Sequence, residues 1–413
     1  MPTPLPSPPL SDPTAVPVGS DSRPAHLLRL WLLMAGSCLP ILGAVLISPV
    51  LPRIQDHYAH VPGANALVPL VLTVPALALA ILAPVAGLVV DRLGRKRLLV
   101  AATLAYGVLG TAPLWLESLA AILVSRVLVG IAEAAIMTCC TTLIGDYYSG
   151  RQREKYLALQ TMCASASATA FFVVGGAAGS AGWRAPFWIY AVSLLLAPAM
   201  AAFLPRPAGD GSATASAAVA RERRPFPFRP LATTCALTVF GAMVFYSVPV
   251  ELPYLLDDLG VKTTGVIGLA TALASAATVA GAVLFTRLRN GGEPYLPLVF
   301  TLCAAGFAVM CLASGPVLLV AGAVVNCVGT GLLLPSLLTR AMSRLDYADR
   351  GRGTGLWTAA FFGGEFACPL LLLALEAAVG TLAAAVGVLA AAVACVALGL
   401  LLSRRRAVGS AAA

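Results

Sequence analysis

Apolar segments of about 20 residues or more alternate along this chain with short stretches of charged, glycine and proline residues. A helix crosses the hydrocarbon core of a bilayer with about 20 residues, at a rise of about 1.5 Å per residue. Only a helix satisfies the backbone hydrogen bonds of such an unbroken segment from within. We therefore predict twelve spanning helices, at 29–52, 66–90, 98–116, 119–146, 157–180, 186–204, 231–250, 265–286, 294–313, 316–339, 354–375 and 379–402.

Composition supports an all-α membrane protein. Of the 413 residues, 59% are hydrophobic and 11% are charged, whereas a soluble domain averages about 25% charged residues. A transmembrane barrel would show alternating polarity over segments of about 10 residues. The pattern excludes a soluble enzyme and a nucleic-acid binder as the main interpretation. The ten cysteines lie within apolar segments without metal-ligand spacing, so neither a disulfide framework nor a metal site is expected.

The basic residues predict the orientation. With the N-terminus placed in the cytoplasm, 23 of the 27 basic residues fall on the cytoplasmic side. The positive-inside rule then predicts that both termini are cytoplasmic, in the cell inner (plasma) membrane. The net charge of +9 is explained in this way without a nucleic-acid partner.

A polar stretch divides the predicted spans six and six. Residues 205–230 are rich in Ala, Ser, Gly and Pro, which is typical of a flexible cytoplasmic linker. The predicted organisation is a disordered tail at 1–26, a six-helix bundle at 27–204, the linker at 205–230, a second bundle at 231–404 and a short tail at 405–413.

Several residues of the first half have a counterpart in the second half, at an offset of 200 residues. Arg126 corresponds to Asn326, both in the fourth span of their half, and Asp146 corresponds to Asp346 at the end of that span. A shared offset favours a duplicated unit. We therefore predict two pseudo-symmetric six-helix bundles, an architecture whose site lies between the bundles near the middle of the membrane.

The loop from Gly87 to Arg97 carries the most specific motif. It resembles the signature loop of the major facilitator superfamily, G-x-x-x-D-R-x-G-R-[RK]-[RK], and all the fixed positions are filled. Arg126 with Gly130, and the stretch 182–187, are also similar to that family. The resemblance implies a secondary transporter that works by alternating access. It further implies a cytoplasmic gate in which Asp91, Arg92 and Arg95 latch onto the other bundle and onto Asp146.

Backbone geometry also explains the two glycines of this loop. Gly87 permits a close helix approach and Gly94 permits a tight turn. The positive-inside rule alone would explain the basic residues of the loop, but not Asp91 or the two glycines.

Two acids lie deep inside predicted spans. Arg126 and Glu133 share a helical face and are separated by about 10 Å along the axis. Glu365 is a second acid near the midplane, in the opposite bundle. Charges at this depth cost at least about 2.5 kcal/mol each, so they should face a wet cavity or a partner. Arg126 with Glu133 is then a proton-coupling or substrate site, or alternatively a structural ion pair.

Desolvation favours the neutral form of a carboxylic acid, which makes Glu133 and Glu365 the candidates for carrying protons. The three histidines lie outside the predicted spans. Asn326 is either a cavity residue or a polar group that joins helices. Glu251, Asp257 and Asp258 follow the seventh predicted span and are expected to be solvated loop charges.

We therefore expect a proton-coupled transporter that exports a small amphipathic compound, a drug or an endogenous metabolite such as a siderophore. Its cavity would contain Arg126, Glu133, Asn326 and Glu365. Its partners would be a small-molecule substrate and membrane lipid, and the chain would act as a monomer. No catalytic residue, metal or cofactor beyond the proton gradient is expected.

Two alternatives stay open. One is a proton-linked importer of an organic acid or sugar, with Arg126 pairing a substrate carboxylate. The other is a membrane sensor or scaffold that transports nothing. The span-five pattern of antiporters, Gly-Pro-x-x-Gly-Gly, is only half present, since Gly175 and Gly176 follow Phe171 and Phe172. Export therefore follows from general similarity to bacterial efflux members.

Overall fold

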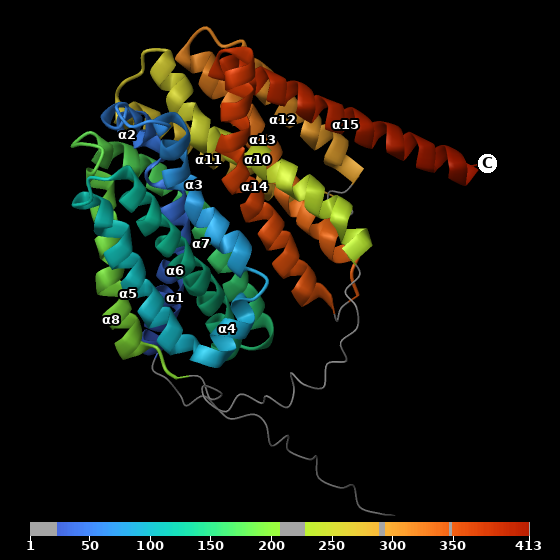
Figure 1. Cartoon of the computed structure of the whole chain (residues 1–413). Coiled ribbons are helices and arrows are strands. Elements are labelled where there is room, and N and C mark those ends of the chain that lie inside the picture. Colours follow the sequence, from blue (N-terminus) through green and yellow to red (C-terminus); the bar gives the residue numbers. More distant parts are fainter. Residues whose placement is uncertain (1–22, 207–227, 289–293, 347–348, 413) are drawn as a thin grey trace, which may run out of the picture.

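The computed structural model describes residues 23–206, 228–288, 294–346 and 349–412 (Figure 1). Within these ranges all regular elements are helical. Eleven helices are long and apolar enough to cross a membrane, and the shorter apolar helix Leu296–Cys311 makes twelve. The predicted number of spans is thus reproduced. The predicted tail at 1–26 and linker at 205–230 fall mostly outside the described residues.

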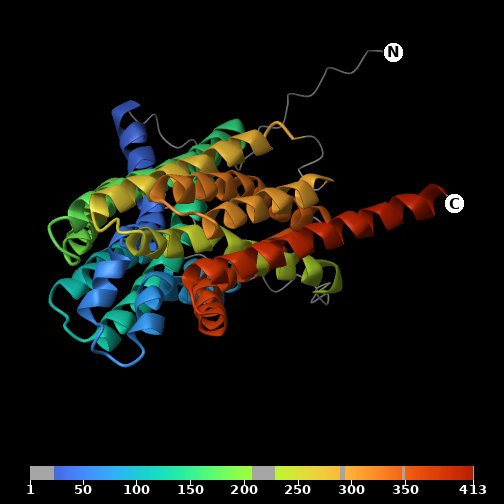
Figure 2. The same cartoon turned by 90° about the horizontal axis from the view of Figure 1, so that it is seen from above.

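The helices of each half follow one another through short connections. The first half comprises α1 (Arg23–Val45), α2 (Leu51–His57), α3 (Ala64–Leu82), α4 (Ala86–Leu93), α5 (Arg95–Thr111), α6 (Leu119–Tyr147), α7 (Gly150–Gly179) and α8 (Val192–Phe203), with 3-10 turns η1 (Ser48–Val50), η2 (Ala112–Leu114) and η3 (Ala185–Ala191). The second half comprises α10 (Phe228–Asp258), α11 (Thr264–Phe285), α12 (Leu296–Cys311), α13 (Pro316–Ser343), α14 (Arg350–Val379) and α15 (Leu382–Ala412). Figure 2 shows α15 extending beyond the other helices.

Several helices are longer than predicted. The prediction ended the seventh span at 250, but α10 continues to Asp258. The expectation that Glu251 is a solvated loop charge is therefore wrong: Glu251 lies in the helix and is 6% exposed. The expected tail at 405–413 is also helical in its backbone, up to Ala412.

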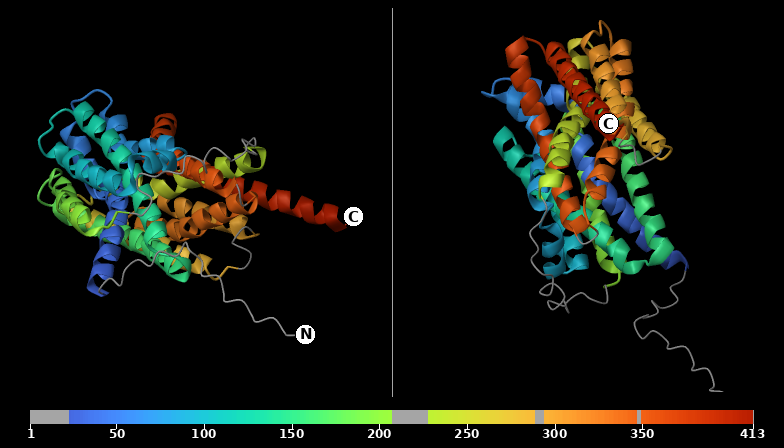
Figure 3. Two further views of the ribbon diagram at one scale, coloured as in Figure 1. Left: turned by 90° about the horizontal axis from the view of Figure 1, so that it is seen from below. Right: turned by 90° about the vertical axis from the view of Figure 1, so that its right-hand side faces the viewer.

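The repeat predicted from the 200-residue offset is visible in the helix bounds. α7 covers 150–179 and α14 covers 350–379, while α3 and α11 begin at 64 and 264. The internal packing also repeats, because α3–α6 and α5–α6 contacts in the first half match α11–α13 and α12–α13 contacts in the second. Seen from below, the two halves lie side by side (Figure 3). Two pseudo-symmetric halves are thus confirmed.

Two helix pairs form most of the contact between the halves, α7 with α11 and α3 with α14. The repeat relates these pairs to each other, since α3 corresponds to α11 and α7 to α14. The α7–α11 crossing is very close: a Cβ added to Gly176 would lie 2.8 Å from the Cα of Gly268. Glycine at both positions lets the two backbones touch.

The halves are tied together toward one face of the molecule. We call this the distal face; it carries the connections 58–63, 180–184, 259–263 and 380–381, whereas the terminal face carries α4 and the start of α1 (Figure 1). Ser48 Oγ donates to the Pro249 carbonyl over 2.5 Å, and Arg53 Nη2 donates to the Lys262 carbonyl over 3.5 Å. In this conformation the seam between the halves is therefore closed distally.

The close crossing makes Gly268→Val a test of this seam. The new Cβ would meet the Phe172 carbonyl oxygen at 2.6 Å, and backbone cannot rotate away. Overpacking costs about 1–3 kcal/mol, which we expect to open the distal seam. In purified protein carrying Ser48→Cys, Gly268→Val should raise the maleimide reaction rate at position 48 at least about fivefold.

Gly265→Val is the matched control, because a Cβ at Gly265 of the same helix meets nothing within 4 Å. It should leave the rate at position 48 unchanged. Equal acceleration by both valines would show that the crossing does not hold the seam.

Candidate functional site

The first span, His26–His57, is interrupted after Val45, and this interruption shapes the site. α1 ends at Val45 and the chain continues through η1 into α2. The last carbonyls of a helix lack an intrahelical donor and must find another one. Here the Gly43 carbonyl accepts from Arg126 Nη2 over 2.9 Å, and the Ala44 carbonyl accepts from the Tyr246 hydroxyl over 2.5 Å. Two side chains from other helices thus complete the end of α1.

Arg126 of α6 is a clamp inside the first half. Pro75 in α3 has no N–H to offer the carbonyl of Val71 one turn earlier, and Arg126 Nε donates to that carbonyl over 3.1 Å. Arg126 Nη1 donates to the Tyr190 hydroxyl over 2.8 Å. The side chain is fully buried, at 0% exposure.

The sequence predicted Arg126 as a cavity residue. In the structure its guanidinium is directed to α1, α3 and η3 inside one half, and Arg126 is not among the residues that line the central cavity between the halves. No ion pair with Glu133 occurs among the described residues either, although the two charges attract each other.

Glu133 lies two turns farther along α6 and is directed toward α1. A Cβ added to Gly43 would overlap Glu133 Oε1, so the missing side chain of Gly43 makes room for this carboxylate. Glu133 is 1% exposed, and its Oε1 has no hydrogen-bond partner. Burying a carboxylate oxygen without a hydrogen-bond donor is costly. A functional role therefore explains Glu133 better than a role in packing does.

A central cavity of about 310 Å³ lies between the halves, and both predicted acids line it. Glu133 enters from α6 of the first half and Glu365 from α14 of the second. Tyr246 also lines the cavity and interacts electrostatically with both carboxylates. The remaining polar side chains of the wall are hydroxyls and one thiol, and no lysine, arginine or histidine is among the lining residues.

Aromatic rings cover the part of the wall next to Glu365. Phe361 stacks on Trp357 with ring centroids 5.7 Å apart and lies 6.0 Å from Phe245. Phe245, Phe361 and Phe362 line the cavity. The sequence did not identify Phe245 or Phe362 as cavity residues, because composition does not show which face of a helix meets the other half.

Asn326, also predicted as a cavity residue, is not among the residues that line the central cavity. Its Nδ2 donates to the Cys303 carbonyl over 3.1 Å, from α13 to α12. A Cβ added to Gly306 of α12 would lie 2.7 Å from the Asn326 Cβ. Asn326 therefore joins two helices of its own half, the alternative that the sequence left open.

Only some residues of the predicted gate can be placed in the structure. Gly94 has φ +83°, a value that favours glycine, as the tight turn requires. Arg95 forms an ion pair with Asp146, which joins α5 to α6 within the first half. Gly87 makes no close helix approach, because an added Cβ would meet nothing within 4 Å. Arg92 is exposed, and the side chain of Asp91 lies outside the described residues.

Comparison with known proteins agrees with this architecture. Residues 33–290 match the family model of the Major Facilitator Superfamily. The chain is 28% identical over 349 residues to the 3-(3-hydroxy-phenyl)propionate transporter of Escherichia coli (strain K12), covering 78% of this chain and 81% of that protein. It is 30% identical over 196 residues to the class C tetracycline resistance protein of Escherichia coli, covering 46% of each.

A solved structure shares the fold. The crystal structure of a D-xylose-proton symporter aligns with a TM-score of 0.76 at 15% sequence identity, over 91% of this chain and 97% of that one. The chain thus belongs to the major facilitator superfamily and is a multi-pass membrane transporter, not an enzyme.

Proposed function

We propose that this protein is a proton-coupled secondary transporter that exports small amphipathic compounds from the cytoplasm. The supporting observation is the central cavity, in which one buried carboxylate from each half, Glu133 and Glu365, faces an otherwise apolar and aromatic wall. The terminal face is assigned to the cytoplasm of an inner (plasma) membrane, since 23 of the 27 basic residues fall in segments that the sequence predicts on that side. The unit is a monomer, and no cofactor besides the proton gradient is needed.

The chemistry follows from the two carboxylates. Ionised, they attract a cationic or hydrogen-bond-donating substrate into a cavity without any basic residue. When the carboxylates are protonated they are neutral, so they no longer attract a cation. The cost of keeping two ionised groups in a medium of low dielectric constant also disappears. Protons taken up from outside would thus release the substrate there, and loss of the protons to the cytoplasm would reset the site. The aromatic wall offers faces for stacking on planar or cationic compounds.

The rival function is proton-linked import of an organic acid or sugar, and the similarity to a 3-(3-hydroxy-phenyl)propionate transporter supports an organic-acid substrate. An organic anion would need a cationic partner in the cavity. Arg126 is the candidate that the sequence offered, but its three donor nitrogens are bound to Val71, Tyr190 and Gly43. The geometry therefore favours a cationic or neutral amphipathic substrate over an organic anion.

We predict that Glu133→Gln and Glu365→Gln each uncouple transport. With ethidium as the probe in everted vesicles, proton-driven uptake should fall to about a hundredth of wild type or less, because no group remains to bind the proton. Ethidium–ethidium exchange, which needs no net proton transfer, should persist.

The control for this experiment is Glu117→Gln, which removes an exposed carboxylate far from the cavity and should leave both fluxes unchanged. Proton-driven uptake at the wild-type rate in both glutamine variants would exclude these acids as coupling groups.

We further predict that Arg126→Gln acts on stability. It leaves buried carbonyls of Val71 and Gly43 without strong donors, and each unsatisfied group costs about 1–3 kcal/mol. The melting temperature of the purified protein should fall by several degrees, whereas Arg97→Gln, at an exposed position, should not change it. An unchanged melting temperature together with lost binding of 3-phenylpropionate would instead support the organic-acid function.

A further inference from the structure

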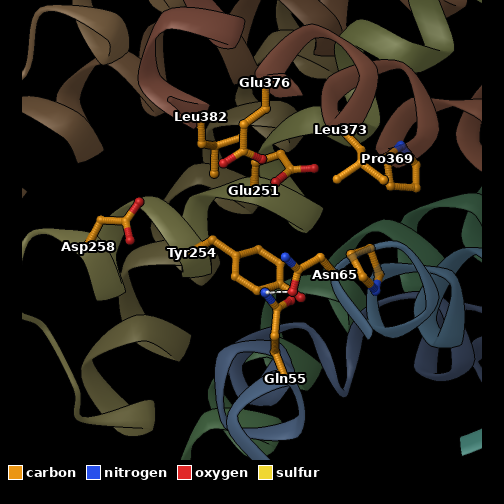
Figure 4. Close-up of a pocket in the computed structure, with 10 residues that line it drawn as sticks. Gln55, Asn65, Glu251, Tyr254, Asp258, Pro369, Leu373, Glu376 and Leu382 are labelled. Atoms are coloured by element: carbon orange, nitrogen blue, oxygen red, sulfur yellow. Dashed lines mark hydrogen bonds between the residues drawn. The ribbon is translucent and has the colours of Figure 1, made fainter. Parts of the chain in front are cut away.

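A second, smaller cavity of about 140 Å³ opens at the distal face, and Glu251 of α10 lines it (Figure 4). Glu376 of α14 faces Glu251 across this cavity, and the ring of Tyr254 lies between Glu251 and the Gln55–Asn65 pair of the first half. Gln55 Nε2 donates to Asn65 Oδ1 over 3.2 Å. Both halves of the transporter thus contribute to the distal cavity.

Glu251 is a buried acid without a partner. It is 6% exposed, and among the described residues it makes no ion pair and no hydrogen bond. None of the ten lining residues is basic. Tyr254 also lines the cavity, and its hydroxyl is buried without a hydrogen-bond partner among the described residues. Two polar side chains at one small cavity therefore have no partner from the described chain, which makes the cavity suitable for binding a proton or a cation.

The surrounding charges do not neutralise Glu251. Glu376 faces it from α14, Asp258 follows it on α10, and Asp56 of α2 interacts with Tyr254. The ammonium group of Lys262 is engaged by Asp257 at 2.5 Å, and this hydrogen bond raises the pKa of Lys262. An acid buried among other acids favours its protonated form over an ionised one.

Two polar side chains, Ser247 and Cys368, lie between this cavity and the central one. Ser247 is one helical turn before Glu251 on α10; its Oγ donates to the Met243 carbonyl over 2.7 Å and lies 3.5 Å from the Cys368 thiol of α14. Cys368 interacts electrostatically with both Glu251 and Glu365. Glu365, Cys368 and Glu376 therefore follow the same side of α14, facing Ser247 and Glu251 of α10. The interface is otherwise tight, since a Cβ at Gly364 would lie 2.7 Å from the Ala242 Cβ.

From this geometry we propose that Glu251 is a proton-binding site that links the distal cavity to Glu365 through Ser247 and Cys368. A hydronium ion in the distal cavity gives its proton to the Glu251 carboxylate and leaves water. Ser247 and Cys368 then each accept one proton and release another, so that one proton leaves Glu251 and one reaches the Glu365 carboxylate. The interface passes protons while it excludes a substrate. This role rests on the proton coupling of the proposed function.

Infrared spectroscopy of the purified full-length protein in lipid tests the site without any substrate. A pH titration should show a carboxylic-acid band that disappears in Glu251→Gln and persists, shifted, in Glu251→Asp. Glu117→Gln, at an exposed position on the same face, should leave the band intact. Glu365→Gln should shift the pH midpoint of the Glu251 band, because linked acids titrate as a pair. A spectrum unaffected by Glu251→Gln, or an unshifted midpoint, overturns the proposal.

Flux measurements test the role in transport. Glu251→Gln should slow proton-driven ethidium uptake at least about tenfold and leave ethidium–ethidium exchange unchanged. Loss of the band with undiminished uptake would overturn the proton route. If the wild-type protein moves no ethidium, the proposed function is wrong for this class of compound, while the band and its midpoint still decide whether Glu251 binds a proton linked to Glu365.

Discussion

A backbone carbonyl without a donor cannot remain so inside a membrane, and this constraint organises the whole structure. Pro75 withholds an N–H from Val71, the end of α1 leaves Gly43 and Ala44, and Pro253 withholds an N–H from Pro249. Each of these carbonyls is reached by a side chain from another helix. The donors are Arg126 for Val71 and Gly43, Tyr246 for Ala44, and Ser48 for Pro249.

The donors fall into two groups with different mechanical consequences. Arg126 bonds only within the first half, so its clamp persists in any movement of the halves as rigid bodies. Tyr246 and Ser48 bond across the seam, and those bonds must break when the distal face opens. Each contributes only about 0.5–1.5 kcal/mol net, because the freed groups can be hydrated in an opened seam. The same constraint thus gives rigidity inside a half and reversibility between the halves.

The sequence predicts the spans, the repeat and the two cavity acids, since a charge in a long apolar segment is a strong signal. It could not distinguish Arg126 from Glu133, because both are charges on one face of one helix. Their roles differ because the Val71 carbonyl lies within reach of Arg126, which only the three-dimensional structure shows. Glu251 was misplaced because the sequence with Pro249 and Pro253 resembles a loop. In the structure the helix continues through both prolines, and Ser48 supplies the hydrogen bond that Pro253 cannot give to the Pro249 carbonyl.

The distribution of charge between the halves follows from the repeat. Each half carries one acid into the central cavity, so when the seam closes, two carboxylates approach each other with no base to separate them. That arrangement is costly unless a cation or protons occupy the cavity. Closure of the empty, deprotonated transporter is therefore disfavoured, and movement of the halves is favoured only with substrate or protons bound. Because the residues that line the cavity include no basic side chain, the two carboxylates need a substrate or protons before the halves can move. Transport of the substrate therefore depends on transport of protons.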